Sequence, residues 1–502
     1  MGLFLGDMKM VLLGLSSFIM VNHVCITFSS PADWLVGEEP LDHNFHIRKL
    51  QEFKSYFFQL QRVSLISSSS PSPSPSPSPS PSPSPGRSGV YDVITYGADP
   101  TGKSDSTNAI LAAISDAVSI NADVDLIQGI SNLGGVQIRL EGGIYNINRP
   151  IKLPVTGRGN ILISGGTLKA SDNFTTDSYM IDLSSSSPSS SNQDYSYEFV
   201  TLRDIMLDCN FRGGGIRAVD ALRTSIDNCY IAHFTTTGIL VQRGHETYIR
   251  NSFLGQHITA GSDPGERNFT GTAIDLQGND NAVTDVVIFS AAIGIMISGQ
   301  ANVITGVHCY NKANWFGGTG IYLKVPGITQ TRIVNSYFDY TGIVAEDPVQ
   351  FHVSDCFFLG DAFIVLKSVR GVVDGINIVN NMFSGSNKGI DIVHLDQSNK
   401  DFEEIGQVVV DKNNVNGMNV KATVARSVTS VNGTSWTVDF RKILVFPRRI
   451  NFVQYSLMTN ASNSFPITIL RNISENQVVF ESNMVVEGSA FVSVDQGLSM
   501  SS

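Results

Sequence analysis

The stretch Gly215-Ile-Arg-Ala, repeated as Gly238-Ile-Leu-Val and Ala273-Ile-Asp-Leu, decides the fold of this 502-residue chain. An apolar–x–apolar unit, usually preceded by a small residue, has anchors at Ile216, Ile239, Ile274, Ile295, Ile321, Ile343, Ile364 and Ile390. Their steps of 23, 35, 21, 26, 22, 21 and 26 residues fit turns of a parallel β-helix, with extra residues in loops. We therefore predict an all-β, right-handed, single-stranded parallel β-helix.

A second unit recurs further along each turn, in which an apolar residue is followed two positions later by Asn or Asp. Examples are Asn228, Asn251, Asn335 and Asn380. Equivalent turns stack on one another in a solenoid, so we interpret these Asn residues as a structural ladder. The same alignment predicts that Cys209 lies directly below Cys229, as inward thiols rather than a disulfide.

Changes in amino-acid composition and in the repeat pattern divide the rest of the chain. We predict a signal peptide (1–30), an N-terminal helical segment (31–66), a Ser/Pro-rich linker (67–88), the β-helix (89–420) and a C-terminal β-rich cap (421–502). A capping helix is expected from Asn108 to Val118, and alternating runs after residue 420 indicate that the cap is antiparallel.

The predicted signal peptide indicates secretion, and a membrane anchor is disfavoured because its apolar run is short and interrupted. Glycosylation sequons at Asn173, Asn268, Asn432, Asn460 and Asn472 fit a secreted glycoprotein. The net charge of -11 argues against nucleic acid, and no later segment is apolar enough to span a membrane. We expect a monomer with no cofactor and no metal site.

Residues one and three positions after each anchor are predicted to face outward. They include Gln242, Gln277, Tyr322, Lys324, Glu346 and Lys367. Such a face suits a sugar polymer, and its lysines favour sugars that carry carboxylates. The alternative is that Lys324, Glu346 and Lys367 form only a solvated ion-pair ladder.

The 35-residue step contains a long loop that carries His257, Asp263, Glu266 and Arg267, and we expect this loop to line a binding cleft beside Asp275. Glycoside hydrolysis needs two carboxyl groups.

We therefore propose Asp275, paired with Asp263, Glu266 or Asp280, as catalytic candidates. His245 is expected to lie near Asp280 and to orient an acid, unless it only bonds a turn.

The segment Tyr91-Asp-Val-Ile-Thr-Tyr-Gly-Ala-Asp-Pro-Thr-Gly-Lys-Ser-Asp-Ser-Thr-Asn-Ala-Ile resembles the opening of the pectate-lyase-like β-helix superfamily. Residues 255–267 and 278–290 resemble the plant QUARTET-type polygalacturonases more narrowly, and the likeness spans about residues 46–498. This resemblance implies a secreted hydrolase that cleaves the α-1,4-galacturonosyl bonds of demethylated homogalacturonan (pectin) in the cell wall, including that of pollen mother cells.

The chain departs from the usual polygalacturonase pattern. Asn-Thr-Asp, Gly-Asp-Asp, Gly-His-Gly and Arg-Ile-Lys are all absent. The catalytic residues of the family therefore cannot be transferred to numbered positions here. The alternatives are a β-helix glucanase, a pectate lyase, or a non-catalytic protein that binds pectin in the wall.

Overall fold

The computed structural model describes residues 89–185, 195–257, 270–310, 317–324, 327–459 and 465–497. The predicted signal peptide, helical segment and linker lie outside these residues. The chain divides into two units, Met1–Ser84 and Pro85–Ser502, and all described residues belong to the second.

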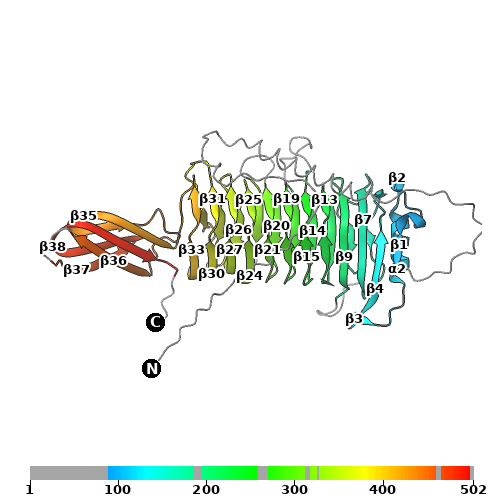
Figure 1. Ribbon diagram of the computed structural model, residues 1–502, viewed down its shortest axis with the longest axis horizontal. Coiled ribbons are helices and arrows are strands. Elements are labelled where there is room, and N and C mark those ends of the chain that lie inside the picture. The colour runs from blue at the N-terminus through cyan, green and yellow to red at the C-terminus, as the bar shows by residue number, and fades with distance from the viewer. Residues whose placement is uncertain are drawn as a thin grey trace, which may run out of the picture. The chain divides into compact units, whose positions relative to one another are not determined.

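Most of the second unit is a parallel β-helix whose strands stack rung upon rung (Figure 1). One of its sheets contains the repeated anchors, and we call it the anchor sheet. Its strands are β6 (Ile151–Lys152), β8 (Tyr179–Leu183), β10 (Gly214–Val219), β14 (Thr237–Gln242), β17 (Thr272–Leu276), β20 (Ile293–Ile297), β23 (Thr319–Leu323), β26 (Ile343–Glu346), β29 (Ile364–Lys367) and β32 (Val393–Asp396).

Two further strands complete each rung after its anchor strand. From β10 onward they are β12 (Ser225–Asp227), β13 (Tyr230–Ala232), β15 (Tyr248–Arg250), β16 (Phe253–Gly255), β18 (Ala282–Thr284), β19 (Val287–Phe289), β21 (Val303–Thr305), β22 (His308–Tyr310), β24 (Gly327–Val334), β25 (Tyr337–Asp339), β27 (Pro348–Ser354), β28 (Phe357–Leu359), β30 (Val372–Val379), β31 (Met382–Ser384), β33 (Glu404–Asp411) and β34 (Asn414–Asn416). The short β11 (Ala221–Leu222) precedes β12. The predicted β-helix is therefore confirmed.

The strand register confirms seven of the eight anchors. Ile216 through Ile364 pair one above another, and each is buried. Isoleucine suits this place because its β-branched side chain packs well on a pleated, buried surface. The eighth anchor is wrong: Val393, not Ile390, pairs with Ile364, because the turn before β32 is three residues longer than the repeat assumed. His394 consequently takes the outward place expected for Asp391.

The turn between the second and third strands of a rung depends on residues that tolerate positive φ. Asn228, Asn251, Asn335 and Asn380 have φ between 50° and 58°. Asn228 and Asn251 also donate amide hydrogen bonds to acidic side chains on the preceding rung. Asn tolerates this left-handed conformation better than most residues, so these positions are structural, although Asn228 and Asn251 bond to aspartates rather than to one another.

The predicted stacking of Cys209 on Cys229 is wrong. Leu207 pairs with Ile231, and this register puts Cys229 opposite Ile205 and Cys209 opposite His233. The four described cysteines are all buried and free, and burial raises the pKa of Cys229 to about 12.

The N-terminal end of the β-helix is closed by α2 (Thr107–Val118), which buries Ile110, Ala113 and Ile114 against the core. Asp105 accepts the backbone N–H of Thr107 and so caps the first turn. The neighbouring strands are β1 (Val90–Asp92), β2 (Thr101–Asp105), β3 (Asp125–Ile127), β4 (Ile130–Arg139), β5 (Ile144–Ile147), β7 (Arg158–Ala170) and β9 (Tyr197–Asp208). Strand β1 ends at Asp92, because η2 (Val93–Tyr96) is a 3₁₀-helix that buries Val93.

The C-terminal cap is an antiparallel sheet, as predicted. It consists of β35 (Val424–Asp439), β36 (Phe452–Thr459), β37 (Thr468–Ser474) and β38 (Gln477–Asp495). It has its own core, in which Trp436 packs against Phe480. No helix among the described residues is long and apolar enough to cross a membrane.

Candidate functional site

A single outward row runs along the anchor sheet and contains two of the predicted site residues, Asp275 and Tyr322. Its members, one per rung, are Lys152, Asp182, Arg217, Leu240, Asp275, Met296, Tyr322, Val344, Val365 and His394. Neighbouring strands lie about 4.8 Å apart, so residues two rungs apart are separated by about 10 Å. Any long ligand that lies along this row meets these side chains in order.

Asp275 is the acidic residue near the middle of this row. Its Oδ1 is inaccessible to solvent and has no hydrogen-bond partner among the described residues. Burial raises the pKa of Asp275, and a hydrogen bond from Gln277 opposes that effect only in part. A carboxyl group of this kind holds its proton to higher pH than an ordinary aspartate and can act as a general acid.

Two predicted substrate-binding residues instead hold Asp275. Gln277 Nε2 donates to Asp275 Oδ2 at 2.9 Å, and Gln242 Nε2 donates to Gln277 Oε1 at 3.0 Å. This amide relay fixes Oδ2 as an acceptor, so Oδ1, which is closed to solvent in the structure, is the oxygen that carries the proton when the group is protonated. Gln277 is exposed, so it can still contact a ligand on the same face.

A cationic cluster lies on the rungs before Asp275. Asp182 is 2% exposed and accepts hydrogen bonds from Arg217 Nε (2.8 Å) and Nη2 (2.7 Å). Lys152 Nζ lies 2.9 Å from Asp182 Oδ2, and Ser184 donates to Oδ1 at 2.7 Å. Burial alone would raise the pKa of Asp182, but Arg217, Ser184 and Lys152 hold it below its usual value. The cluster carries two cations for one carboxylate.

The sequence interpretation missed Asp182 and Lys152 and gave Arg217 no role. A signal was available, because Ile181-Asp-Leu is the same tripeptide as Ile274-Asp-Leu. Met180, rather than a small residue, precedes Ile181, so this earlier copy does not match the repeat that begins at Gly215.

A second polar cluster lies beyond Asp275. Tyr322 donates its hydroxyl hydrogen to Glu346, and Lys367 Nζ lies 3.0 Å from Glu346 Oε1 and 3.2 Å from the Tyr322 hydroxyl. Burial alone would raise the pKa of Glu346, but these partners and the nearby charge of Lys324 lower it. Glu346 and Lys367 therefore form an ion pair, as the alternative interpretation of these residues predicts. Lys324 is exposed, and its side chain forms no hydrogen bond or close ion pair with a described residue.

His245 and Asp280 meet as expected, with His245 Nδ1 3.1 Å from Asp280 Oδ2. The pair lies in the turn after the anchor strands, and Asp280 has a positive φ of 58°. Asp280 follows Asp275 by five residues in the sequence, and no hydrogen bond links the two carboxyl groups. Within the described chain, the outward positions of β10, β14, β20 and β23 hold no carboxylate.

The remaining predicted site residues belong to the long loop. His257 is 4% exposed, and its ring packs 5.4 Å from Phe211. Asp263, Glu266 and Arg267 lie outside the described residues, so their roles stay predictions. Of the sequons, Asn173, Asn432 and Asn472 are exposed, while Asn268 and Asn460 lie outside the described residues.

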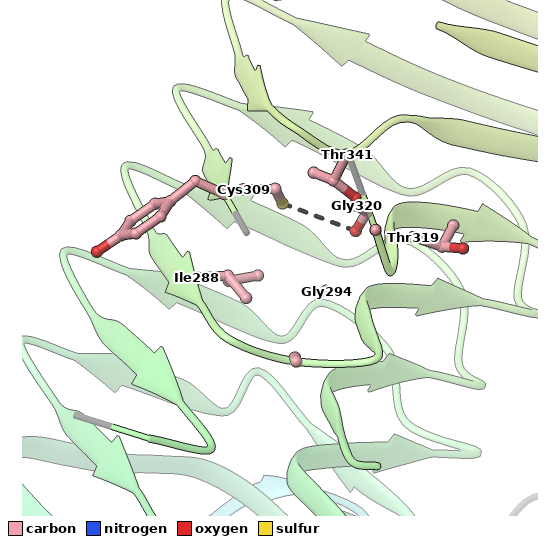
Figure 2. A pocket seen from close by; sticks show the side chains of 9 residues that line it. Ile288, Gly294, Cys309, Thr319, Gly320 and Thr341 are labelled. Carbon is pink, nitrogen blue, oxygen red and sulfur yellow. Dashed lines mark hydrogen bonds between the residues drawn. The ribbon is translucent and has the colours of Figure 1, made fainter. Parts of the chain in front are cut away.

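A small internal space of about 10 Å³ lies where the third strand of a rung turns into the anchor sheet. Figure 2 shows Ile288, Cys309 and Thr341 around it, with Cys309 Sγ 3.7 Å from the Gly320 carbonyl oxygen. It is large enough for about one water molecule and has no carboxyl group in its lining.

The described residues contain no group of three His, Cys, Asp or Glu side chains placed to hold a metal ion. The outward row is therefore the better candidate site.

The chain was compared with family models and with solved structures. No family model matches the sequence. Among solved structures, it is similar to endo-xylogalacturonan hydrolase from Aspergillus tubingensis (TM-score 0.48, 13% identity, 66% of this chain and 95% of the other). It is also similar to the tailspike protein mutant D339A of E. coli bacteriophage HK620 (TM-score 0.40, 9% identity, 82% and 94%).

The similarity to a curated protein is much higher. Over 410 residues, 82% of this chain and 85% of the relative, the sequence is 62% identical to "Polygalacturonase QRT3" of Arabidopsis thaliana. Identity of this extent over nearly the whole folded body is found only between members of one family. The chain therefore belongs to the family of the plant polygalacturonase QRT3.

Proposed function

We propose that the protein is a secreted glycoside hydrolase of the plant cell wall that cleaves α-1,4-galacturonosyl bonds in demethylated pectin. The family relationship supports the reaction class, because the Arabidopsis relative is named a polygalacturonase. The observation that carries the proposal is Asp275, a partly buried carboxyl group with a raised pKa and an unpartnered Oδ1 on an outward row.

The charges along the row favour an acidic polymer. Two rungs before Asp275 stands Arg217, which is one-third exposed although it holds Asp182. Two rungs after Asp275 stands Tyr322, with exposed Lys324 beside it. A galacturonan lying along the sheet would place its carboxylates near cations on both sides of Asp275. Arginine and lysine pair well with such carboxylates.

Asp275 is proposed as the general acid that protonates the leaving oxygen. The reaction also needs a carboxylate that activates water or attacks the sugar. We propose that Asp263, Glu266 or Asp280 supplies it, with His245 orienting Asp280 in the last case. The absence of a second carboxylate on the described outward positions near Asp275 favours the two loop residues.

The test is the release of reducing ends from polygalacturonate by purified protein. Asp275→Asn should lower turnover by about 10²–10⁴-fold. Asp285→Asn is a matched control, because Asp285 lies on the same rung at a positive-φ turn position where other rungs already carry Asn. Asp263→Asn, Glu266→Gln and Asp280→Asn then identify the second carboxyl group. Unchanged activity in Asp275→Asn would remove that residue from the mechanism.

The lack of a second carboxylate on the described outward positions near Asp275 also favours one alternative, a protein that binds pectin without cleaving it. Binding of polygalacturonate with no product at any pH would establish that function. Products that absorb in the ultraviolet would instead indicate a lyase.

A further inference from the structure

The C-terminal sheet has an outer face that its own core does not use. Along β35, β38 and β36, alternate side chains pack into the core around Trp436 and Phe480, and the others face outward. The register places these outward residues in rows across three strands. One row is Arg426, Ser493 and Gln454, and the adjacent row is Val428, Phe491 and Ser456.

These six residues line a shallow depression of about 260 Å³. The apolar row is unusually exposed for a sheet, with Val428 65% and Phe491 41% accessible. An aromatic face beside guanidinium, amide and hydroxyl groups is a composition that binds sugars, because the ring packs against C–H bonds while the polar groups bond hydroxyls.

Arg426 differs from the other arginines of the cap. Arg441, Arg448 and Arg471 each form an ion pair with an acid of the cap, and Arg449 donates to the Ile405 carbonyl oxygen. Arg426 forms no ion pair or side-chain hydrogen bond with any described residue. Its guanidinium is therefore available for a bidentate contact with a carboxylate from outside the chain.

We infer that this face is a second polysaccharide-binding surface, which holds uronate residues of the same polymer that the anchor sheet is proposed to cleave. Arg426 binds a sugar carboxylate, Phe491 and Val428 support a sugar ring, and Gln454 with the two serines bonds hydroxyl groups. The inference rests on the proposed substrate class but not on catalysis. A second surface raises the effective concentration of the polymer at the first, without any new contact there.

The test measures binding without turnover, on the full secreted chain carrying Asp275→Asn. Its retardation is measured by electrophoresis through gels containing polygalacturonate or its fully methyl-esterified form. Arg426→Gln should weaken retention by polygalacturonate about tenfold, as expected for loss of a charged hydrogen-bonded contact. Phe491→Ser should weaken it as well. Lys442→Gln is the matched control, because it removes an exposed cation of the cap outside the sheet strands.

The outcomes separate this inference from the proposed hydrolysis. If the wild-type chain never cleaves galacturonan but Arg426→Gln loses retention, the binding surface stands and the proposed function fails. If wild type cleaves but Arg426→Gln and Phe491→Ser bind as well as Lys442→Gln, the surface is overturned. It is overturned too if sedimentation shows a dimer that Phe491→Ser dissociates while retention is unchanged, since the face would then bind a second copy.

Discussion

Asp182 and Asp275 occupy the same row of the same sheet, in the same Ile-Asp-Leu tripeptide, yet their surroundings give them opposite properties. Asp182 is enclosed by Arg217, Lys152 and Ser184, and its pKa is lowered. Asp275 has Leu240 and Met296 as its neighbours in the row, and its pKa is raised. Cationic neighbours lower the pKa of the first carboxyl group, whereas burial without a cationic partner raises the pKa of the second.

The largest effect should come from Asp275→Asn. An amide cannot donate a proton as a carboxylic acid does, so we expect kcat on polygalacturonate to fall by about 10²–10⁴-fold. Stability at neutral pH should not fall, because the variant no longer buries a partly desolvated charge. Reducing-end assays and thermal denaturation measure the two. A large loss of stability would mean that Asp275 resembles Asp182 after all.

Asp182→Asn should show the converse pattern. It removes the carboxylate that compensates Arg217 and Lys152, and we expect a loss of about 2 kcal/mol in unfolding free energy. Because the pKa of Asp182 is lowered on folding, this contribution is present above its unfolded pKa and is lost as the pH falls through the folded value. Denaturation of both proteins across acidic pH checks this. Equal stability at all pH values would contradict the assignment.

A smaller effect is expected from Lys324→Met. Removing one exposed cation beside the row should raise KM for polygalacturonate about fivefold with little change in kcat, since exposed charge contacts contribute about 1 kcal/mol or less. The difference should shrink at high ionic strength. Lys103→Met, an exposed change on β2, serves as control. A fall in kcat alone would place Lys324 in the chemistry rather than in binding.

The smallest effect concerns the pH profile. If Asp275 is the acid, kcat/KM should fall as the pH rises through its raised pKa, because only the protonated form donates. Gln277→Met removes the hydrogen bond that lowers this pKa, so the alkaline limb should move to higher pH. Rate measurements over a pH series reveal the shift. A limb that stays in place, or moves to lower pH, would show that another group controls it.

Much of the fold was predictable because the repeat is local and periodic. The anchors Ile216 to Ile364 indicated the rung length, the buried face and the outward row. The predicted register of the last rung was wrong, because the turn before Val393 is longer than the repeat assumed. Nothing in the residues themselves marks where this loop ends and the strand begins. The contact of His245 with Asp280 was also predictable, because equivalent positions of neighbouring rungs lie side by side.

The sequence by itself determined that the chain is a parallel β-helix. From Ile216 to Ile364 it also determined which residues face outward, Asp275 among them. Only the tertiary structure decided the surroundings of each acid. The tripeptide around Asp182 is identical to that around Asp275, and the difference in their pKa values comes largely from residues on neighbouring rungs, distant in the chain, that the stacking brings alongside. Electrostatic environment depends on neighbours in space, and a repeat pattern fixes which rung is adjacent but not how its side chains pair.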